Sequence, residues 1–453
     1  MQVDYHNLKI PSSKYYILNT MIYLDHAATT PCDKRVVKKM LPYFDEIYGN
    51  PSGIYKVSRQ AKKGMDEARK IIAKFLNCKT DEIVFTNGGT ESDNLAILGV
   101  ARIWSGSQDF QRGRSIRAQA SNGASKPSLK VQTRPHIVTT QIEHSAVLNS
   151  CQQLEKEGLE VTYLAPNRNG IVSAEKVKKA LKPNTILVSI MYANNEIGTI
   201  QPIAKIAKVI RDFRKAFSLQ PSAFSRKMAL PFFHTDACQA TQYLEMDVET
   251  LGVDLLTFNG SKIYGPKGIG VLCVRSGIEI APILFGGEQE KGLRPGTENV
   301  PAIVGLGEAV RLIDSKSAKG EQELRDLMIE NLLRIENSEL NGDPKKRLQN
   351  SVNIAFHGVE GEAAVLYLDE RGIACSTGSA CLSKTLKPSH VILALGKGEE
   401  AAHSSLRFTL GRKTTKKDII YTIKNVSQVV KKLRGMSAIN KLKVKRRWLN
   451  HIQ

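Results

Sequence analysis

Residues 136–165 have the sequence HIVTTQIEHSAVLNSCQQLEKEGLEVTYLA, and this stretch decides the fold class. A short β-branched run opens it, a helix-like segment occupies residues 145–158, and a second apolar run follows at 159–165. A strand, a helix and another strand in succession favour a parallel β–α–β unit. Similar strand-like runs recur at 83–86, 185–193, 232–237, 254–259 and 270–275.

This alternation predicts an α/β fold with a mostly parallel sheet, in a large domain over residues 21–300. From residue 301 the pattern changes to helices with a few strands, which predicts a smaller α+β domain over 301–453. We expect residues 1–20 to be a flexible N-terminal extension and the segment after them to pack on the small domain. Residues 104–134 and 218–230 are interpreted as inserted loops, because they carry too little apolar surface to offset their ordering entropy.

The composition is ordinary for a globular protein of 453 residues, with 42% hydrophobic and 24% charged residues. No run of about 18 apolar residues appears, so no membrane span is expected. The first twenty residues lack the apolar core of a secretory signal. The seven cysteines show no CxxC pairing. This argues against a disulfide framework or a structural zinc site and favours a cytoplasmic location.

The formal net charge of +21 needs its own interpretation. A basic surface can bind nucleic acid or an acidic partner. We interpret the charge as lysine-rich solvated faces and do not expect nucleic acid as a partner. A non-catalytic basic scaffold protein stays open as an alternative.

Polar residues follow the ends of the predicted strands, which is where open α/β sheets bind ligands. Gly89 and Thr90 come after the strand at 83–86 and begin a helix, whose amides and dipole favour a phosphate. The other strand ends supply His144, Asn195, Asp236, Gln239 and Lys262. Each residue alone is a weak signal, but the set predicts a site.

This set matches the requirements of pyridoxal phosphate. A lysine attaches the cofactor covalently, and a carboxylate keeps its pyridine nitrogen protonated. The glycine-rich alternatives fail, because there is neither a GxGxxG motif between strand and helix near the start nor a P-loop around Lys262.

Two further candidates lie in the predicted small domain. Cys381 sits in a Gly- and Ser-rich loop, residues 375–390, which suits an accessible nucleophilic thiol; an inert, partly buried cysteine is the alternative. Arg407 lies in an apolar, strand-like run and therefore needs an anion. A substrate carboxylate and an internal salt bridge both remain open.

The chain resembles the cysteine desulfurases, pyridoxal-phosphate enzymes of the class V aminotransferase family, over residues 21–435. The resemblance implies the fold type I of these enzymes. The long Cys-loop is similar to that of the branch that serves iron–sulfur assembly. The matching motifs, in family order, are YLDHAATTP (23–31), GNPSG (49–53), FTNGGTESDN (85–94), IEHSAV (142–147), NNEIG (194–198), HTDACQ (234–239), GSKIYGPKG (260–268), GLRPGTENV (292–300), TGSACLS (377–383) and LRFTLGR (406–412).

The resemblance implies a role for each matching residue. Lys262 anchors the cofactor, Asp236 pairs with its ring nitrogen, and His144 stacks on the ring and handles protons. Asn195 and Gln239 bond the phenolic oxygen, and Arg407 with Asn195 grips the substrate carboxylate. The phosphate is held by Gly89, Thr90, Asn259, Gly260, Ser261 and, from the neighbouring subunit of a homodimer, Thr297.

The implied reaction converts L-cysteine to L-alanine and leaves a persulfide on Cys381. The sulfur then passes to an acceptor protein, such as an iron–sulfur scaffold, for cluster assembly or tRNA thiolation. Selenocysteine lyase and small-amino-acid aminotransferase are the alternatives within the fold. No resident metal is expected, although Cys381 can transiently share an iron–sulfur cluster with a scaffold partner.

Four positions depart from the family pattern. Asn259 and Ser261 replace a serine and a histidine of the phosphate-binding segment, and Tyr55 and Ser58 replace a histidine and a glycine. Since the cradle loses an imidazole, we predict weaker cofactor retention but not a dead enzyme. Dialysis followed by absorbance of the bound cofactor measures this; retention as tight as in histidine-bearing relatives contradicts it.

Overall fold

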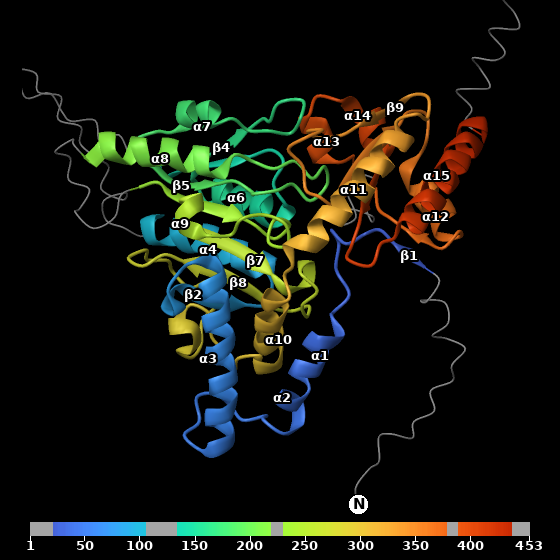
Figure 1. Ribbon diagram of the computed structural model, residues 1–453. Helices are drawn as coiled ribbons and strands as arrows, with labels where there is room; N and C mark the ends of the chain where they lie inside the picture. Colours follow the sequence, from blue (N-terminus) through green and yellow to red (C-terminus); the bar gives the residue numbers. More distant parts are fainter. Residues whose placement is uncertain (1–20, 106–133, 219–229, 378–387, 437–453) are drawn as a thin grey trace, which may run out of the picture.

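A seven-stranded sheet forms the centre of the molecule. The computed structural model describes residues 21–105, 134–218, 230–377 and 388–436 (Figure 1). The strand order is β2-β8-β7-β6-β5-β3-β4, and β8 runs in the direction opposite to that of the other six strands. The strands are β2 (Ile83–Thr86), β3 (His136–Thr140), β4 (Glu160–Leu164), β5 (Thr185–Ser189), β6 (Phe232–Asp236), β7 (Leu255–Asn259) and β8 (Gly270–Val274). The predicted α/β fold with a mostly parallel sheet is therefore confirmed.

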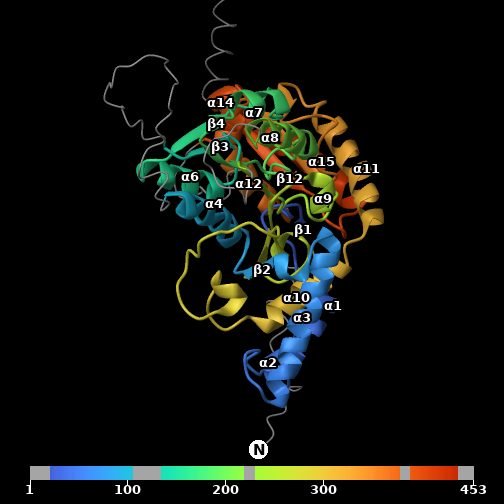
Figure 2. The same ribbon diagram turned by 90° about the vertical axis from the view of Figure 1, so that its left-hand side faces the viewer.

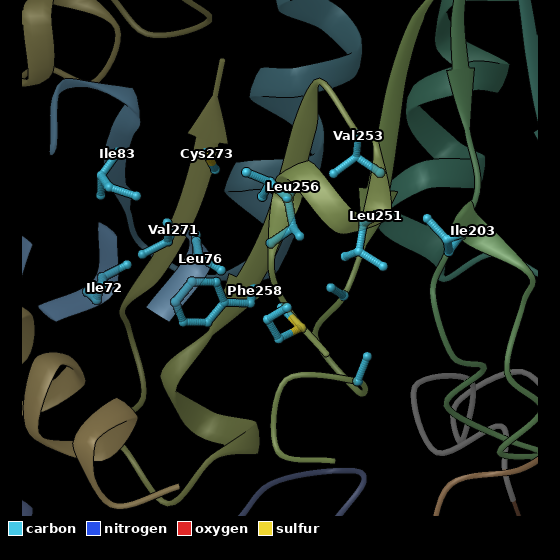
Figure 3. Packing of buried hydrophobic residues seen from close by; sticks show 14 of the residues in the cluster. Ile72, Leu76, Ile83, Ile203, Leu251, Val253, Leu256, Phe258, Val271 and Cys273 are labelled. Atoms are coloured by element: carbon cyan, nitrogen blue, oxygen red, sulfur yellow. The ribbon is translucent and has the colours of Figure 1, made fainter. Parts of the chain in front are cut away.

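Helices cover both faces of this sheet, because successive strand residues point to opposite sides. On β7, Leu255 packs in the core beneath α4 and α6, whereas Leu256 and Phe258 pack in the core beneath α3, α8 and α10. Figure 3 shows Leu256 and Phe258 beside Leu76 of α3. The helices are α3 (Lys56–Leu76), α4 (Gly89–Ser105), α6 (Ser145–Lys156), α7 (Ala174–Ala180), α8 (Ile203–Ser218), α9 (Val248–Leu251) and α10 (Val300–Arg311). Of the two edge strands, β2 is buried and β4 is only partly buried.

A second hydrophobic core lies around a three-stranded antiparallel sheet of order β12-β10-β9. Figures 1 and 2 show its helices grouped on one side of the molecule, away from α2 and α3. The elements are α11 (Ser315–Leu332), β9 (Ser338–Leu340), β10 (Ser351–Phe356), α12 (Gly361–Asp369), β11 (Ile373–Ala374), α13 (His390–Ala394), α14 (Gly398–His403), β12 (Ser405–Thr409) and α15 (Lys416–Met436). No helix of the described residues is both long and apolar enough to cross a membrane.

The first described residues join this second core. Strand β1 (Ile22–Tyr23) pairs in parallel with β11, and Asp25 forms a bridge with Thr409 beyond it. The chain then crosses to the large sheet, where α1 (Lys34–Met40) and α2 (Pro42–Asp45) follow. The N-terminal extension at 1–20 and nearly all of the two predicted insertions lie outside the described residues.

Candidate active site

A cavity of about 500 Å³ opens at the carboxyl ends of the parallel strands. Its lining comes from the turns after β2, β3, β5, β6 and β7, which is the place predicted for a ligand. Ten of the predicted site residues line it: Gly89, Thr90, His144, Asn195, Asp236, Gln239, Asn259, Ser261, Lys262 and Arg407. The fold thus brings together side chains that are far apart in the sequence.

Three predicted site residues lie elsewhere. Gly260 is buried in the turn after β7 and does not line the cavity; a Cβ on it would lie 2.6 Å from the Pro266 carbonyl oxygen. Thr297 is exposed and does not line the cavity of its own chain. Cys381 lies outside the described residues. Of the departures from the family pattern, Tyr55 is exposed and is also absent from the lining.

The turn after β2 is the anion cradle expected from the sequence, called the Gly89 cradle below. Gly88 has a φ of +140°, a backbone conformation that glycine adopts readily, and α4 begins at the next residue. A Cβ on Gly89 would lie 2.8 Å from Cys238 Sγ and 3.0 Å from Asn259 Nδ2, so a larger residue there would have to push these side chains aside. The amides of a helix N-terminus attract a phosphate, and the Asn259 amide group lies beside them. Ser261 donates a hydrogen bond to Asn259 Oδ1 at 3.3 Å.

Lys262 follows β7 in a single 3₁₀ turn. Its Nζ donates to the carbonyl oxygens of Ala27 and Ala28 at 2.7 and 2.6 Å. Gln239 donates to the Ala27 carbonyl as well, at 3.0 Å. Burial lowers the pKa of Lys262, which favours the neutral, nucleophilic amine. The lysine is therefore held beside the backbone of the segment that begins at β1.

Asp236 ends β6 at the bottom of the cavity and accepts a hydrogen bond from the Cys238 amide at 2.9 Å. Beneath it lies His234, which contacts Ser189 Oγ at 2.9 Å and Thr257 Oγ1 at 3.0 Å. Burial lowers the pKa of His234 to about 4, so the ring is neutral. His234 shares one face of the strand with Asp236, a relation that strand alternation could have revealed.

Asp93 adds a second acid to this region. It lies one helical turn after Gly89 on α4, is 1% exposed, and lines the cavity. Burial, and then the charge of Asp236, raise its pKa well above the usual range. Sequence reasoning missed this residue; the spacing of Gly89 and Asp93 on one helix face was the available signal.

His144 is the N-cap of α6. Its Nδ1 accepts a hydrogen bond from the Ala146 amide at 3.1 Å, so the neutral ring carries its proton on Nε2. Burial lowers the pKa of His144, which keeps the ring neutral near pH 7. The cap fixes both the position of the ring and its tautomer.

Glu143, just before His144, is fully buried. It accepts hydrogen bonds from Thr140 Oγ1 at 2.7 Å and from the Met191 amide at 3.0 Å. Burial raises its pKa from 4.5 to about 8. Because the folded pKa exceeds the unfolded one, its contribution to stability is complete below about pH 4.5 and is lost as the pH rises through about 8.

Glu143→Gln is therefore expected to gain stability relative to the wild type as the pH rises. The amide cannot ionise, whereas the wild type buries a carboxylate at high pH. The difference in Tm between variant and wild type, measured at pH 5.5 and at pH 8.5, should be more positive at the higher pH. A constant difference would contradict the assignment.

Arg407 lies on β12 with a side chain that is 3% exposed. Its Nη2 pairs with Asp25 Oδ1 at 2.7 Å, and its Nη1 donates to the Asn195 carbonyl oxygen at 3.0 Å. The internal ion pair that the sequence left open is thus present, while the arginine still lines the cavity. Asp25 stands inside the YLDHAATTP motif, but the sequence analysis did not single it out.

Further lining residues that sequence reasoning missed include Ala27, Ala28, Glu91, Met191, Glu196, Cys238 and His390.

Comparisons with known proteins agree with this geometry. The model of the aminotransferase class-V family matches residues 22–118 and 112–421. The chain is 43% identical over 424 residues to a cysteine desulfurase IscS of Methanosarcina thermophila, covering 93% of this chain and 95% of that one. It is 43% identical over 420 residues to a cysteine desulfurase IscS of Dictyoglomus turgidum, covering 92% and 96%.

Solved structures give the same result. A NifS-like protein superposes with a TM-score of 0.77 at 30% identity, covering 91% of this chain and 99% of its own. SspA in complex with cysteine superposes with a TM-score of 0.70 at 35% identity, covering 87% and 100%. Fold, motifs and relatives therefore agree, and the chain belongs to the cysteine desulfurases of the class-V aminotransferase family.

Proposed function

We propose that the protein is a pyridoxal-phosphate-dependent cysteine desulfurase, which converts L-cysteine to L-alanine and passes the sulfur to Cys381. The observation that carries the proposal is the single cavity that holds Lys262, Asp236, the Gly89 cradle and Arg407 together. Iron–sulfur cluster assembly, tRNA thiolation or both would use the sulfur.

The residues present fit pyridoxal phosphate. Gly88, Gly89 and Thr90 line the cavity at the N-terminus of α4, and the backbone amides there suit the phosphate. Asp236, fixed by the Cys238 amide, suits the pyridinium nitrogen, and Lys262 Nζ lies in the same cavity. Bound there, the cofactor would supply an electron sink for the Cα of the amino acid.

Side chains of the protein would bind the substrate, exchange protons and accept the sulfur. Arg407 binds the substrate carboxylate, and Lys262 and His144 exchange protons inside the cavity. The Cys381 thiolate attacks the substrate sulfur: an S–S bond forms, the C–S bond breaks, and the carbon takes a proton to give alanine. The role of Cys381 rests on the resemblance, because the residue lies outside the described part of the chain.

The proposal includes a homodimer. Phe44, Tyr48, Ile54 and Phe285 are 63%, 70%, 88% and 84% exposed, and a second copy of the chain would cover such apolar side chains. Thr297, exposed outside its own cavity, would then reach the partner's phosphate site. Sulfur-acceptor proteins, such as an iron–sulfur scaffold, are the further partners that we propose.

Two general properties belong to the same proposal. The division into a large domain (21–300) and a small domain (301–453) is supported by the separate cores of the two sheets, although α10 packs on α3. A cytoplasmic setting is supported by the six cysteines of the described residues, all of which are free thiols.

Product analysis tests the function. Protein reconstituted with pyridoxal phosphate is incubated with L-cysteine and a thiol reductant but no keto acid, and alanine and sulfide are quantified. We expect the two products in equal amounts. An aminotransferase would need a keto-acid acceptor and would release no sulfide, and a scaffold protein would form neither product; either outcome overturns the proposal.

A further inference from the structure

The segment from Tyr23 to Ala28 contacts two side chains that line the cavity, Arg407 and Lys262. The Asp25 carboxylate pairs with Arg407, and two and three residues later the carbonyl groups of Ala27 and Ala28 accept hydrogen bonds from Lys262. The segment thus contacts both the proposed carboxylate-binding group and the proposed cofactor anchor.

Arg407 still has N–H donors for a ligand, but its positive charge is largely balanced by a neighbouring carboxylate. A guanidinium carries five N–H donors. Among the described residues, Nη2 uses one on Asp25 and Nη1 uses one on the Asn195 carbonyl, while the buried Nε has no hydrogen-bond partner. A substrate carboxylate therefore finds free N–H groups, but the positive charge behind them is already balanced by Asp25.

The backbone around Asp25 is held by contacts other than the ion pair with Arg407. Its carbonyl oxygen accepts hydrogen bonds from the Ala28 amide at 3.0 Å and from the Tyr23 hydroxyl at 3.0 Å. The Ala27 amide donates to Thr409 Oγ1 at 2.8 Å, which ties the segment to β12. The backbone thus places the Asp25 side chain beside Arg407, so a substrate that approaches the guanidinium meets the charge of Asp25 as well.

We propose that Asp25 is a positioning residue which acts through Arg407 and sets the affinity for the substrate carboxylate. Its oxygen holds the guanidinium in place, and its charge weakens the attraction of Arg407 for a second carboxylate. The inference rests on the proposed function, because L-cysteine and its product L-alanine carry the same carboxylate. Weak binding of that group would keep both molecules exchangeable.

The variant Asp25→Asn separates the effect of the hydrogen bond to Arg407 from the effect of the negative charge. The amide oxygen can still accept the Arg407 hydrogen bond, but the negative charge is gone. We expect the KM for L-cysteine and the Kd of L-alanine, measured by calorimetry on the holoenzyme, each to fall by about fivefold or more. The kcat should not rise, since the charge of Asp25 affects the binding of the carboxylate equally in the substrate and in the transition state. Asp25→Ala, which also loses the hydrogen bond, should bind both ligands less tightly than Asp25→Asn.

Asp254→Asn is the matched control. Asp254 also forms an ion pair with an arginine, Arg214, and its side chain is 19% exposed against 17% for Asp25. It lies before the start of β7, at the opposite end of the strand from the cavity. In the Asp254→Asn variant, the KM for L-cysteine and the Kd of L-alanine should remain those of the wild type.

The outcomes are distinguishable. An unchanged or increased KM and Kd in Asp25→Asn, in a preparation whose wild type produces alanine, overturns the role of Asp25. A wild type that produces no alanine from L-cysteine overturns the proposed function instead. In that case the calorimetric Kd of L-alanine still decides whether the Asp25 charge weakens carboxylate binding.

Discussion

Lys262→Ala is expected to reduce alanine production by roughly 10³-fold or more. The variant loses both the amine that attaches the cofactor and a group that exchanges protons in the cavity. Because the remaining contacts to Asp236 and the Gly89 cradle are non-covalent, the cofactor should leave on dialysis. The measurements are the rate of alanine formation and the absorbance of the bound cofactor before and after dialysis.

Lys267→Ala is the matched control for this prediction. Lys267 lies five residues further in the same loop, but it is exposed and does not line the cavity. Its variant should keep the cofactor and the activity of the wild type. Loss of the cofactor from the Lys267 variant, or its full retention by the Lys262 variant, would show that the two lysines are assigned the wrong way round.

The second large effect is the loss of sulfide production that we expect from Cys381→Ala. The variant should produce no sulfide above background from L-cysteine, because no thiolate receives the substrate sulfur. It should still bind the cofactor, since none of the residues that fit it changes. Mass spectrometry of the wild type after exposure to L-cysteine should find one added sulfur at Cys381, and none in the variant.

Cys375→Ala is the appropriate comparison for Cys381. Cys375 is the first residue of the same loop but is buried, and burial raises the pKa of its thiol far above the usual range. A thiol that stays protonated is a poor nucleophile. The Cys375 variant should therefore keep sulfide production. Equal sulfide production by the Cys381 variant and the wild type would refute the persulfide role.

The sequence was informative where the signal was local. The strands of the large sheet are short apolar runs, and residues directly after β2, β3, β5, β6 and β7 line the cavity, because carboxyl ends of parallel strands share one edge. Lys262 and Asp236 could therefore be predicted from position alone. The resemblance to a family then attached a role to each residue.

Contacts between distant segments could not be predicted in this way. The pairing of β1 with β11 joins two-residue strands that have no periodicity of their own. The partner of Arg407 was undecidable from the sequence, because Asp25 lies 382 residues away and any acid in the chain was a candidate. Asp93 and His234 were missed for a related reason: their burial depends on how α4 packs over the sheet.

The long separation of Asp25 from Arg407 in the sequence has a consequence for biosynthesis. The ribosome makes Asp25 382 residues before its partner Arg407. At the usual elongation rates of about 5–20 residues per second, the two are synthesised roughly 20–75 s apart. During that time the segment around Asp25 lacks Arg407 and Thr409 as partners. Because Arg407 follows every strand of the large sheet in the sequence, the Asp25–Arg407 side of the cavity can form only after that whole sheet has been synthesised.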